Sequence, residues 1–263
     1  MRNASTSGVD TIINLPCNVL DVILGCLPWK DAMKTSILSK DWRYKWVTRQ
    51  ELDFNDEFFK YFKQDEEAKI IIYQVLLVHK GPILKFRLCS FTSCPDIDHW
   101  MHFLLKKNVQ EFTLHYLMNG GEPESFLTVL DNIRSLNFSS MSLSKIEEVP
   151  GVVYLITSCP KLQDLTIEFD PVVVEDIVEP VVEFLRCQSF SLGAEKLQRV
   201  HVNLFIGLEM EMKFMKFILA SVLVLKEISI LNFVYLLHRS DKQMMDGMKE
   251  ISRASPNIEF IFE

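Results

Sequence analysis

The sequence lacks the short motifs that mark the commonest enzymatic sites. Its 263 residues contain no P-loop, no glycine-rich dinucleotide turn, no nucleophile elbow and no H-E-x-x-H pair. Paired carboxylates do occur, such as Glu66-Glu67 and Glu147-Glu148, but they lie in polar runs where we expect exposed side chains. The sequence therefore predicts a protein that is not an enzyme and that carries no cofactor.

Cysteines and histidines at the spacing of a metal site are also scarce. Cys89, Cys94, His99 and His102 form the best candidate set, with the spacing C-x4-C-x4-H-x2-H. A zinc finger needs a longer central span and about three to five residues between its histidines. We therefore expect ordinary core or surface residues at these four positions and no metal.

An excess of positive charge is absent as well. The chain has 28 Lys and Arg against 35 Asp and Glu, which gives a formal net charge of −7. That balance argues against a nucleic-acid partner. The basic stretch 40–49 could suggest a DNA-recognition helix, but Trp42 and Trp46 within it favour packing.

Long apolar segments are scarce. The most apolar run, 217–225, is too short to cross a bilayer, and charged residues flank it. The six cysteines are scattered, and no signal-peptide pattern is recognisable. We therefore expect a reduced, intracellular setting and no membrane partner.

A helical pattern near the start is the first positive feature of the sequence. After Leu15-Pro16, the apolar residues Val19, Leu20, Ile23, Leu24 and Leu27 follow i, i+3 and i+4 steps. Proline is tolerated in a first helical turn, and Pro28 would stop this helix. We expect a second short helix over 30–37 and a third that starts near Ser39, all after a disordered tail at 1–9.

The segment 10–54 is too small to form a stable core by itself. It nevertheless holds three of the four tryptophans, Trp29, Trp42 and Trp46, beside many aliphatic residues. Such an apolar excess predicts an exposed face that binds another protein. A small helical core packed on the rest of the chain explains the same spacing equally well.

This segment resembles the F-box, in its plant variety. The matching residues are Leu15-Pro16, Val19-Leu20, Ile23-Leu24, Leu27-Pro28, Asp31-Ala32, Thr35-Ser36, Leu38-Ser39, Trp42-Arg43, Trp46 and Leu52-Asp53-Phe54. The resemblance implies a three-helix domain over 10–54 that binds the adaptor subunit of SCF-type ubiquitin ligases and, through it, a cullin. The adaptor-binding residues that it implies are Leu15, Pro16, Val19, Ile23, Leu27, Pro28 and Trp42.

Beyond a helical connector expected over 55–82, a short apolar pattern recurs. It has the form apolar-x-x-apolar-x-apolar and occurs as Ile83/Phe86/Leu88, Val109/Phe112/Leu114, Ile133/Leu136/Phe138, Leu162/Leu165/Ile167, Leu197/Val200/Val202 and Leu225/Ile228/Ile230. The start-to-start separations are 26, 24, 29, 35 and 28 residues. Four of these five fit the period of about 20–29 residues expected of leucine-rich repeats.

Polar residues alternate with these apolar anchors, and this alternation predicts short, half-buried strands. Helix-like segments at 97–106, 149–158 and 212–223 separate the strands. Strands that alternate with helices predict an α/β fold in which a parallel sheet has helices on its other side.

The polar positions should stack in two columns on the strand face that points away from the apolar anchors. The first column would hold Arg87, Thr113, Asn137, Thr166, His201 and Ser229, and its companion Lys85, Glu111, Ser135, Asp164, Arg199 and Glu227. Solenoid proteins bind through their concave face, so we expect these columns to bind a target protein. A merely solvated sheet face would show the same alternation.

The repeats at 83–206 resemble the irregular leucine-rich repeats of plant F-box proteins, and residues 207–263 resemble the C-terminal FBD domain of that group. The FBD features are the helix at 214–219, the strand at 224–230 and the tetrapeptide Arg253-Ala254-Ser255-Pro256. The chain departs from the pattern twice. Met141 and Asp170 stand where regular repeats have a buried Asn or Cys ladder, and a repeat is missing near Gly120-Gly121.

Together these resemblances imply a non-catalytic substrate-receptor subunit of an SCF-type E3 ubiquitin ligase, in the nucleus or the cytoplasm. Its F-box would hold the adaptor and its repeats an unidentified target protein, so that the subunit supplies proximity. Two alternatives stay open. One is a shortened receptor that binds adaptor but no target, and the other is a repeat-based interaction module with no role in ubiquitin transfer.

Overall fold

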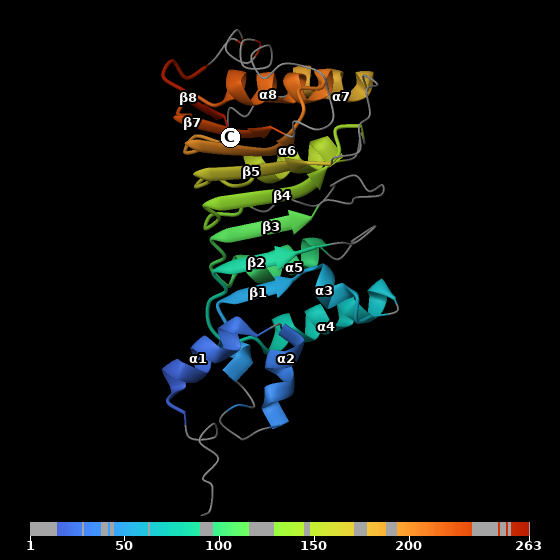
Figure 1. Ribbon diagram of the computed structural model, residues 1–263, viewed down its shortest axis with the longest axis vertical. Helices are drawn as coiled ribbons and strands as arrows, with labels where there is room; N and C mark the ends of the chain where they lie inside the picture. The colour runs from blue at the N-terminus through green and yellow to red at the C-terminus, as the bar shows by residue number, and fades with distance from the viewer. Residues whose placement is uncertain are drawn as a thin grey trace, which may run out of the picture.

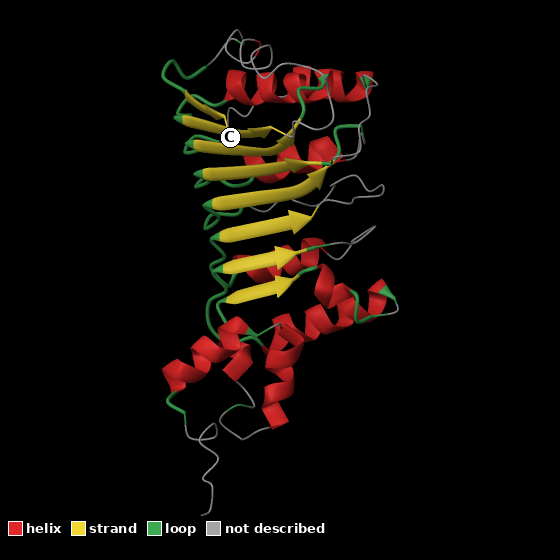
Figure 2. Ribbon diagram, viewed as in Figure 1, coloured by secondary structure: helices red, strands yellow, loops and turns green. Residues whose placement is uncertain are grey.

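One parallel β-sheet runs through the structure, which is a computed structural model (Figures 1 and 2). The structure describes residues 15–27, 29–37, 42, 45–62, 64–89, 97–115, 129–144, 148–170, 178–187, 194–232, 247, 251 and 254–262. The sheet has eight strands that follow one another in sequence order, and every neighbouring pair is parallel. The predicted α/β class with a parallel sheet is therefore confirmed.

Six of the strands coincide with the six apolar patterns found in the sequence. The strands are β1 (Glu51–Phe54), β2 (Lys85–Leu88), β3 (Glu111–His115), β4 (Ser135–Met141), β5 (Asp164–Phe169), β6 (Arg199–Phe205), β7 (Glu227–Asn232) and β8 (Glu259–Phe262). β1 and β8 extend the sheet by one strand at each end. The segments 10–54 and 207–263 thus both contribute strands to the same sheet as the repeats, while their boundaries as domains stay a prediction.

The helices cover one face of the sheet and its β1 end. They are α1 (Cys17–Cys26), α2 (Trp29–Lys34), α3 (Asp56–Phe59), α4 (Asp65–Val78), α5 (Ile97–Leu105), α6 (Glu148–Thr157), α7 (Glu179–Cys187) and α8 (Glu209–Ser221), with 3-10 helices η1 (Thr35–Ile37) and η2 (Lys45–Thr48). Figure 1 shows α5 and α6 behind the strands, and α1 and α2 beyond β1. None of the helices in the described part is both long and apolar enough to cross a membrane.

Most of the expected helices are confirmed. The segments 97–106, 149–158 and 212–223 correspond to α5, α6 and α8, and the connector 55–82 holds α3 and α4. Of the third helix expected near Ser39, the structure shows the short η2, while residues 38–41 lie outside the described part.

The hydrophobic core fills the space between the sheet and its helices. In β2, for example, Phe86 and Leu88 are buried whereas Lys85 and Arg87 are exposed. A continuous cluster of buried apolar residues extends from Leu52 in β1 to residues of β7 and includes side chains of α4, α5, α6 and α8. Each repeat therefore buries its apolar face against its neighbours, as a stacked solenoid must.

A shared backbone carbonyl sets the level at which each strand begins. The carbonyl oxygen of Gln50, just before β1, accepts hydrogen bonds from the amides of Leu84 (2.7 Å) and Lys85 (3.1 Å), where β2 begins. The same pair of bonds recurs at the carbonyls of Leu84, Gln110, Arg134, Gln163 and Gln198. At the last step the carbonyl of Lys226 accepts the amide of Glu259 at 2.8 Å. The strands therefore start in register from β1 to β8.

Two strands end in an irregular turn of the backbone. β4 and β6 each shift register near their ends, where Ser140 and Leu204 have φ angles of +57° and +55°. The left-handed region costs a residue other than glycine about 1–2 kcal/mol. Other contacts must therefore hold the backbone where these two strands leave the sheet.

Buried carboxylates supply those contacts. Glu148 Oε2 accepts the amide of Ser142 at 2.8 Å, and Glu211 Oε2 accepts the amides of Ile206 and Leu208 at 3.1 and 3.0 Å. Each glutamate lies in the first turn of the helix that follows its strand, Glu148 in α6 after β4 and Glu211 in α8 after β6. Their side chains are buried, with 0% and 4% of the residue exposed. The expectation that Glu148 is exposed is therefore wrong, because its carboxylate binds backbone that has left the sheet.

The pKa of Glu211 should make the stability of the protein depend on pH. Burial raises the pKa of Glu211 to about 7, although the backbone amides that donate to it act in the opposite direction. The unfolded chain loses this proton near pH 4.3. Because the folded-state pKa is the higher one, this group's contribution to stability is full below the unfolded value and is lost as the pH rises through the folded value.

We expect Glu211→Gln to gain stability over the wild type by up to about 3 kcal/mol as the pH rises from about 4 to about 8. Urea unfolding at both pH values measures this difference. Glu209→Gln is the matched control, because that carboxylate lies on the same helix with its side chain 58% exposed. If Glu211→Gln keeps the pH dependence of the wild type, another group is responsible for it.

Candidate protein-interaction surfaces

A small hydrophobic cluster holds α1, α2 and η2 together. Its buried members are Leu20, Leu24, Ala32 and Trp42, none of which is more than 2% exposed. Leu15, Ile23, Leu27 and Trp46 pack against it and stay partly exposed. Trp46 also packs against the main core of the sheet. A cluster of this size is a weak core by itself, so these helices depend on the sheet and on what they bind.

The predicted adaptor-binding residues that remain accessible lie mainly on α1. Pro16 and Val19 are exposed, and Leu15, Ile23 and Leu27 are half-buried. They form one partly apolar face at the end of the molecule farthest from β8 (Figure 1). This position suits a docking surface, and the role of these residues stays a prediction.

Two predicted residues do not join that face, and one exposed residue extends it. Trp42 is 2% exposed, so its side chain stabilises the cluster from inside. Pro28 lies outside the described residues. Val22 is 67% exposed on α1 and was missed, because the sequence pattern followed the residues that share a stripe with Leu20 and Leu24.

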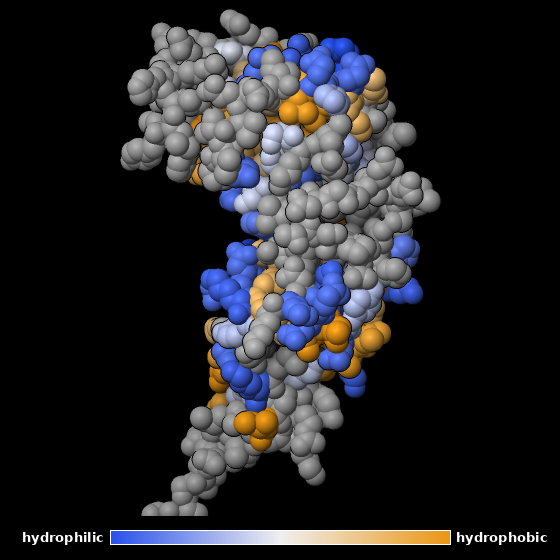
Figure 3. Space-filling view, turned by 90° about the vertical axis from the view of Figure 1, so that its right-hand side faces the viewer, coloured by the Kyte–Doolittle hydropathy of each residue, from blue (hydrophilic) through white to orange (hydrophobic). Residues whose placement is uncertain are grey.

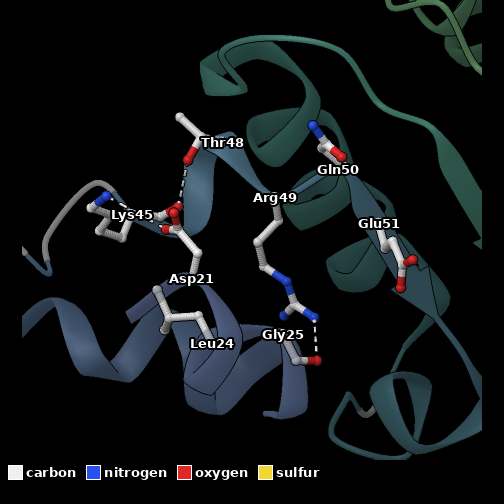
Figure 4. A pocket seen from close by; sticks show the side chains of 8 residues that line it. All are labelled: Asp21, Leu24, Gly25, Lys45, Thr48, Arg49, Gln50 and Glu51. Atoms are coloured by element: carbon white, nitrogen blue, oxygen red, sulfur yellow. Dashed lines mark hydrogen bonds and ion pairs between the residues drawn. The ribbon is translucent and has the colours of Figure 1, made fainter. Parts of the chain in front are cut away.

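Arg49 joins these helices to the sheet. It stands two residues before β1, where later repeats place a buried apolar anchor such as Ile83 or Val109. Its guanidinium turns back instead, and Nη1 donates to the carbonyl of Leu27 at 3.2 Å. Nη2 donates to the carbonyl of Gly25 at 3.3 Å (Figure 4). A cation is favourable there because the carbonyls at a helix C-terminus carry partial negative charge.

The joint at Arg49 borders an open cavity of about 400 Å³ (Figure 4). Asp21 of α1, Lys45 of η2 and Glu51 of β1 also line it. Lys45 Nζ lies 3.5 Å from the carboxylate of Asp21. The two cations of the basic stretch 40–49 whose side chains are described, Lys45 and Arg49, therefore bind groups of α1, which disfavours a DNA-recognition helix.

His79 holds the other side of this joint. Its ring Nε2 lies 2.8 Å from the carbonyl oxygen of Arg49, so this nitrogen carries the proton. Its backbone amide donates to Val75 at the end of α4, and its carbonyl accepts the ammonium of Lys107, after α5, at 2.9 Å. Burial, helped by the positive charge of Lys107, lowers the pKa of His79 and favours the neutral ring. α1, β1, α4 and the end of α5 thus meet at one point.

Arg49→Met should loosen this joint. The variant keeps a long aliphatic side chain but loses both hydrogen bonds to the α1 carbonyls. Because bonds from a charged donor contribute about 1.5–3 kcal/mol, we expect the free energy of unfolding in urea to fall by about 1–3 kcal/mol. Lys34→Met is the control, since Lys34 forms an exposed ion pair with Asp31, and such pairs contribute about 0–1 kcal/mol. Equal losses in both variants would contradict a special role for Arg49.

The open face of the sheet carries the two predicted columns. Register pairs Arg87, Thr113, Asn137, Thr166, His201 and Ser229 in succession. It likewise pairs Lys85, Glu111, Ser135, Asp164, Arg199 and Glu227. β1 and β8 add Asp53 and Ile261 to the ends of the first column, and Glu51 and Glu259 to those of the second. The column geometry is confirmed, with neighbours about 4.8 Å apart, whereas its role in target binding stays a prediction.

Ion pairs tie the basic residues of the columns to acidic neighbours on adjacent strands. Lys85 Nζ lies 3.1 Å from a carboxylate oxygen of Glu111 and 4.0 Å from one of Glu51. The other pairs are Arg87 with Asp53 at 3.8 Å and Arg199 with Asp164 at 2.9 Å. Reversing the charge of either arginine would therefore create repulsion within the sheet, and would not test partner binding cleanly.

Uncharged hydrogen-bonding groups occupy the middle of the open face. Asn137 Nδ2 donates to Thr113 Oγ1 at 3.1 Å, and His115 Nδ1 lies 3.1 Å from Ser139 Oγ. Thr166 and the imidazole of His201 follow in the first column. The described open face is therefore a polar, hydrogen-bonding surface without an apolar patch at its centre.

The structure describes the side chains of only two of the four candidate metal ligands, Cys89 and His102, and these two form no metal site. Cys89 is buried after β2, where burial raises the pKa of its thiol to about 11, and His102 is exposed on α5. Cys94 and the side chain of His99 lie outside the described part. Within that part, no group of three or more His, Cys, Asp or Glu is placed to hold a metal ion.

Comparisons with known proteins agree with this architecture. No family model matches the chain. An F-box/FBD/LRR-repeat protein of Arabidopsis thaliana is 30% identical over 233 residues, which cover 75% of this chain and 54% of the relative. A second protein of that description from the same plant is 28% identical over 208 residues, 68% of this chain and 48% of the relative. The comparisons support the plant F-box/FBD/LRR-repeat family.

A further relative bears on the length of the chain. An F-box/LRR-repeat protein of Arabidopsis thaliana is 27% identical over 217 residues, which cover 77% of this chain and 70% of the relative. For the two F-box/FBD/LRR-repeat proteins, in contrast, the chain spans about half of their length. The F-box/FBD/LRR-repeat resemblance thus covers most of this chain but only part of those relatives.

Proposed function

We propose that the protein is a non-catalytic substrate-receptor subunit of an SCF-type E3 ubiquitin ligase. The α1 face would bind the adaptor, and through it a cullin, while the open sheet face would recruit a target protein for ubiquitylation. The observation that carries this proposal is the joint at Arg49, because it fixes a partly apolar helical face and a polar open sheet as parts of one body. Such a subunit contributes proximity and orientation to the reaction.

The α1 face has the character of a docking surface. Pro16, Val19 and Val22 expose apolar side chains next to a cluster too small to cover them. Exposed apolar surface on a small unit indicates a site for another protein. The F-box names of the relatives agree with this assignment for the adaptor. We place the subunit in the nucleus or the cytoplasm, where the ligases of this class would act.

Val19→Asp tests the adaptor face. A charge placed in an apolar interface must lose its water on binding, so we expect affinity for the adaptor to fall at least about tenfold. Because Val19 is exposed, the melting temperature should change little. The matched control is Ile70→Asp, since Ile70 is 56% exposed on α4, away from α1. Affinity is measured directly with purified adaptor.

The outcomes separate the alternatives. Unchanged adaptor affinity in Val19→Asp, or an equal loss in Ile70→Asp, would remove the α1 face from the proposal. Adaptor binding without capture of any ubiquitylated protein would identify a shortened receptor. Target capture without adaptor binding would identify a repeat-based interaction module.

A further inference from the structure

The open sheet face has more carboxylates than cations. Its described positions on β1–β8 hold the acidic residues Glu51, Asp53, Glu111, Asp164, Glu168, Glu227 and Glu259, and the basic residues Lys85, Arg87 and Arg199. With its histidines neutral, this face carries a formal charge of −4. Each of the three cations already binds a carboxylate of a neighbouring strand.

The surplus of negative charge lies between β5 and β8. Glu168 stands opposite Asn203, and Glu227 stands directly opposite Glu259. Like charges that face each other across two strands destabilise a sheet. Arg199 attracts Glu227 as well, but its hydrogen bonds go to Asp164. The fold therefore retains a repulsion that a positively charged occupant of this face would relieve.

The spacing of charges on the face suits an extended chain. Figure 3 faces the side toward which the strands of Figure 1 point, and hydrophilic residues are prominent on the described surface at mid-height. Glu168 lies two strands from Glu227 and four residues further along the strand direction, a separation of roughly 16 Å. In an extended segment, residues i and i+4 point to the same side and lie about 13 Å apart. Two Lys or Arg side chains four residues apart would therefore reach both carboxylates, since their length covers the remaining few ångströms.

We propose that the open face between β5 and β8 binds an extended segment of the target protein that carries Lys or Arg side chains. This inference rests on the proposed function, in which the open face recruits the target. Thr166, His201 and Ser229 lie between these carboxylates and offer hydrogen-bonding groups to the backbone of the segment. A phosphopeptide or a nucleic acid fits poorly, because the cations of the described open face are already held by carboxylates.

A displayed library of random 12-residue peptides, selected on the full chain in complex with purified adaptor, tests this inference. The test variant is Glu168→Gln, Glu227→Gln, Glu259→Gln. The control is Glu179→Gln, Glu183→Gln, Glu209→Gln, which removes the same charge from exposed positions on α7 and α8. Non-specific attraction of basic peptides should fall equally in both variants, whereas binding at the open face should fall only in the first.

We expect the wild type and the control to enrich peptides with net positive charge. The test variant should bind the enriched peptides at least about tenfold more weakly, with an unchanged or raised melting temperature. Enrichment of neutral or acidic peptides, no enrichment, or equal losses in the two variants would overturn the inference. Adaptor affinity is measured on the same preparations. If the wild type does not bind the adaptor, the proposed function is refuted. If it binds the adaptor but does not enrich basic peptides, only this inference is refuted.

Discussion

The hydrogen bonds to one backbone carbonyl ahead of each strand determine where every open-face side chain lies. The carbonyl of Gln50 accepts two amides at the start of β2, the repeats up to β7 copy this arrangement, and β8 keeps one of the two bonds, so all eight strands begin at one level. A slip of one residue at any step would move the core side chains of that strand to the open face. The columns, the ion pairs and the continuous core therefore all depend on the same bonds, and β1 brings the N-terminal helices under the same constraint.

The inner six strands could be predicted from the sequence because each repeats a local pattern. A buried anchor stands two residues ahead of the strand, and apolar residues then alternate with polar ones. β1 and β8 lack that signal, since Arg49 and the exposed Asn257 occupy the anchor position. Arg49 is explained only by carbonyls of Gly25 and Leu27, which are 24 and 22 residues away along the chain. A pattern read within one repeat cannot contain a contact of that kind.

The candidate surfaces were predictable to different degrees for similar reasons. Column membership follows from alternation alone, and register confirms it. On α1, apolar residues occur on more than one side of the helix, so spacing could not show that Val22 would be exposed. Nor could it show that Trp42, which lies outside α1, would be buried against that helix. Glu148 lies in a polar run, and no periodicity marks a carboxylate that holds the backbone of a strand end. Like Arg49, Glu148 binds backbone that only the fold brings near.

The joint between the helices and the sheet is built on backbone acceptors, and it therefore does not depend on the side chains of the open sheet face. Arg49 donates to the carbonyls of Gly25 and Leu27, His79 to that of Arg49, and Lys107 to that of His79. A backbone carbonyl is present whatever side chain the residue carries, so these bonds constrain only the donor side chains of Arg49, His79 and Lys107. The charged side chains of the open face add little to the stability of the fold, because exposed ion pairs contribute little. Such a fold can change what its sheet binds without changing how the sheet is held against the helices. A substrate receptor needs this separation between the residues that bind a target and the residues that hold the fold. Relatives that are 26–30% identical to the chain agree with such a separation.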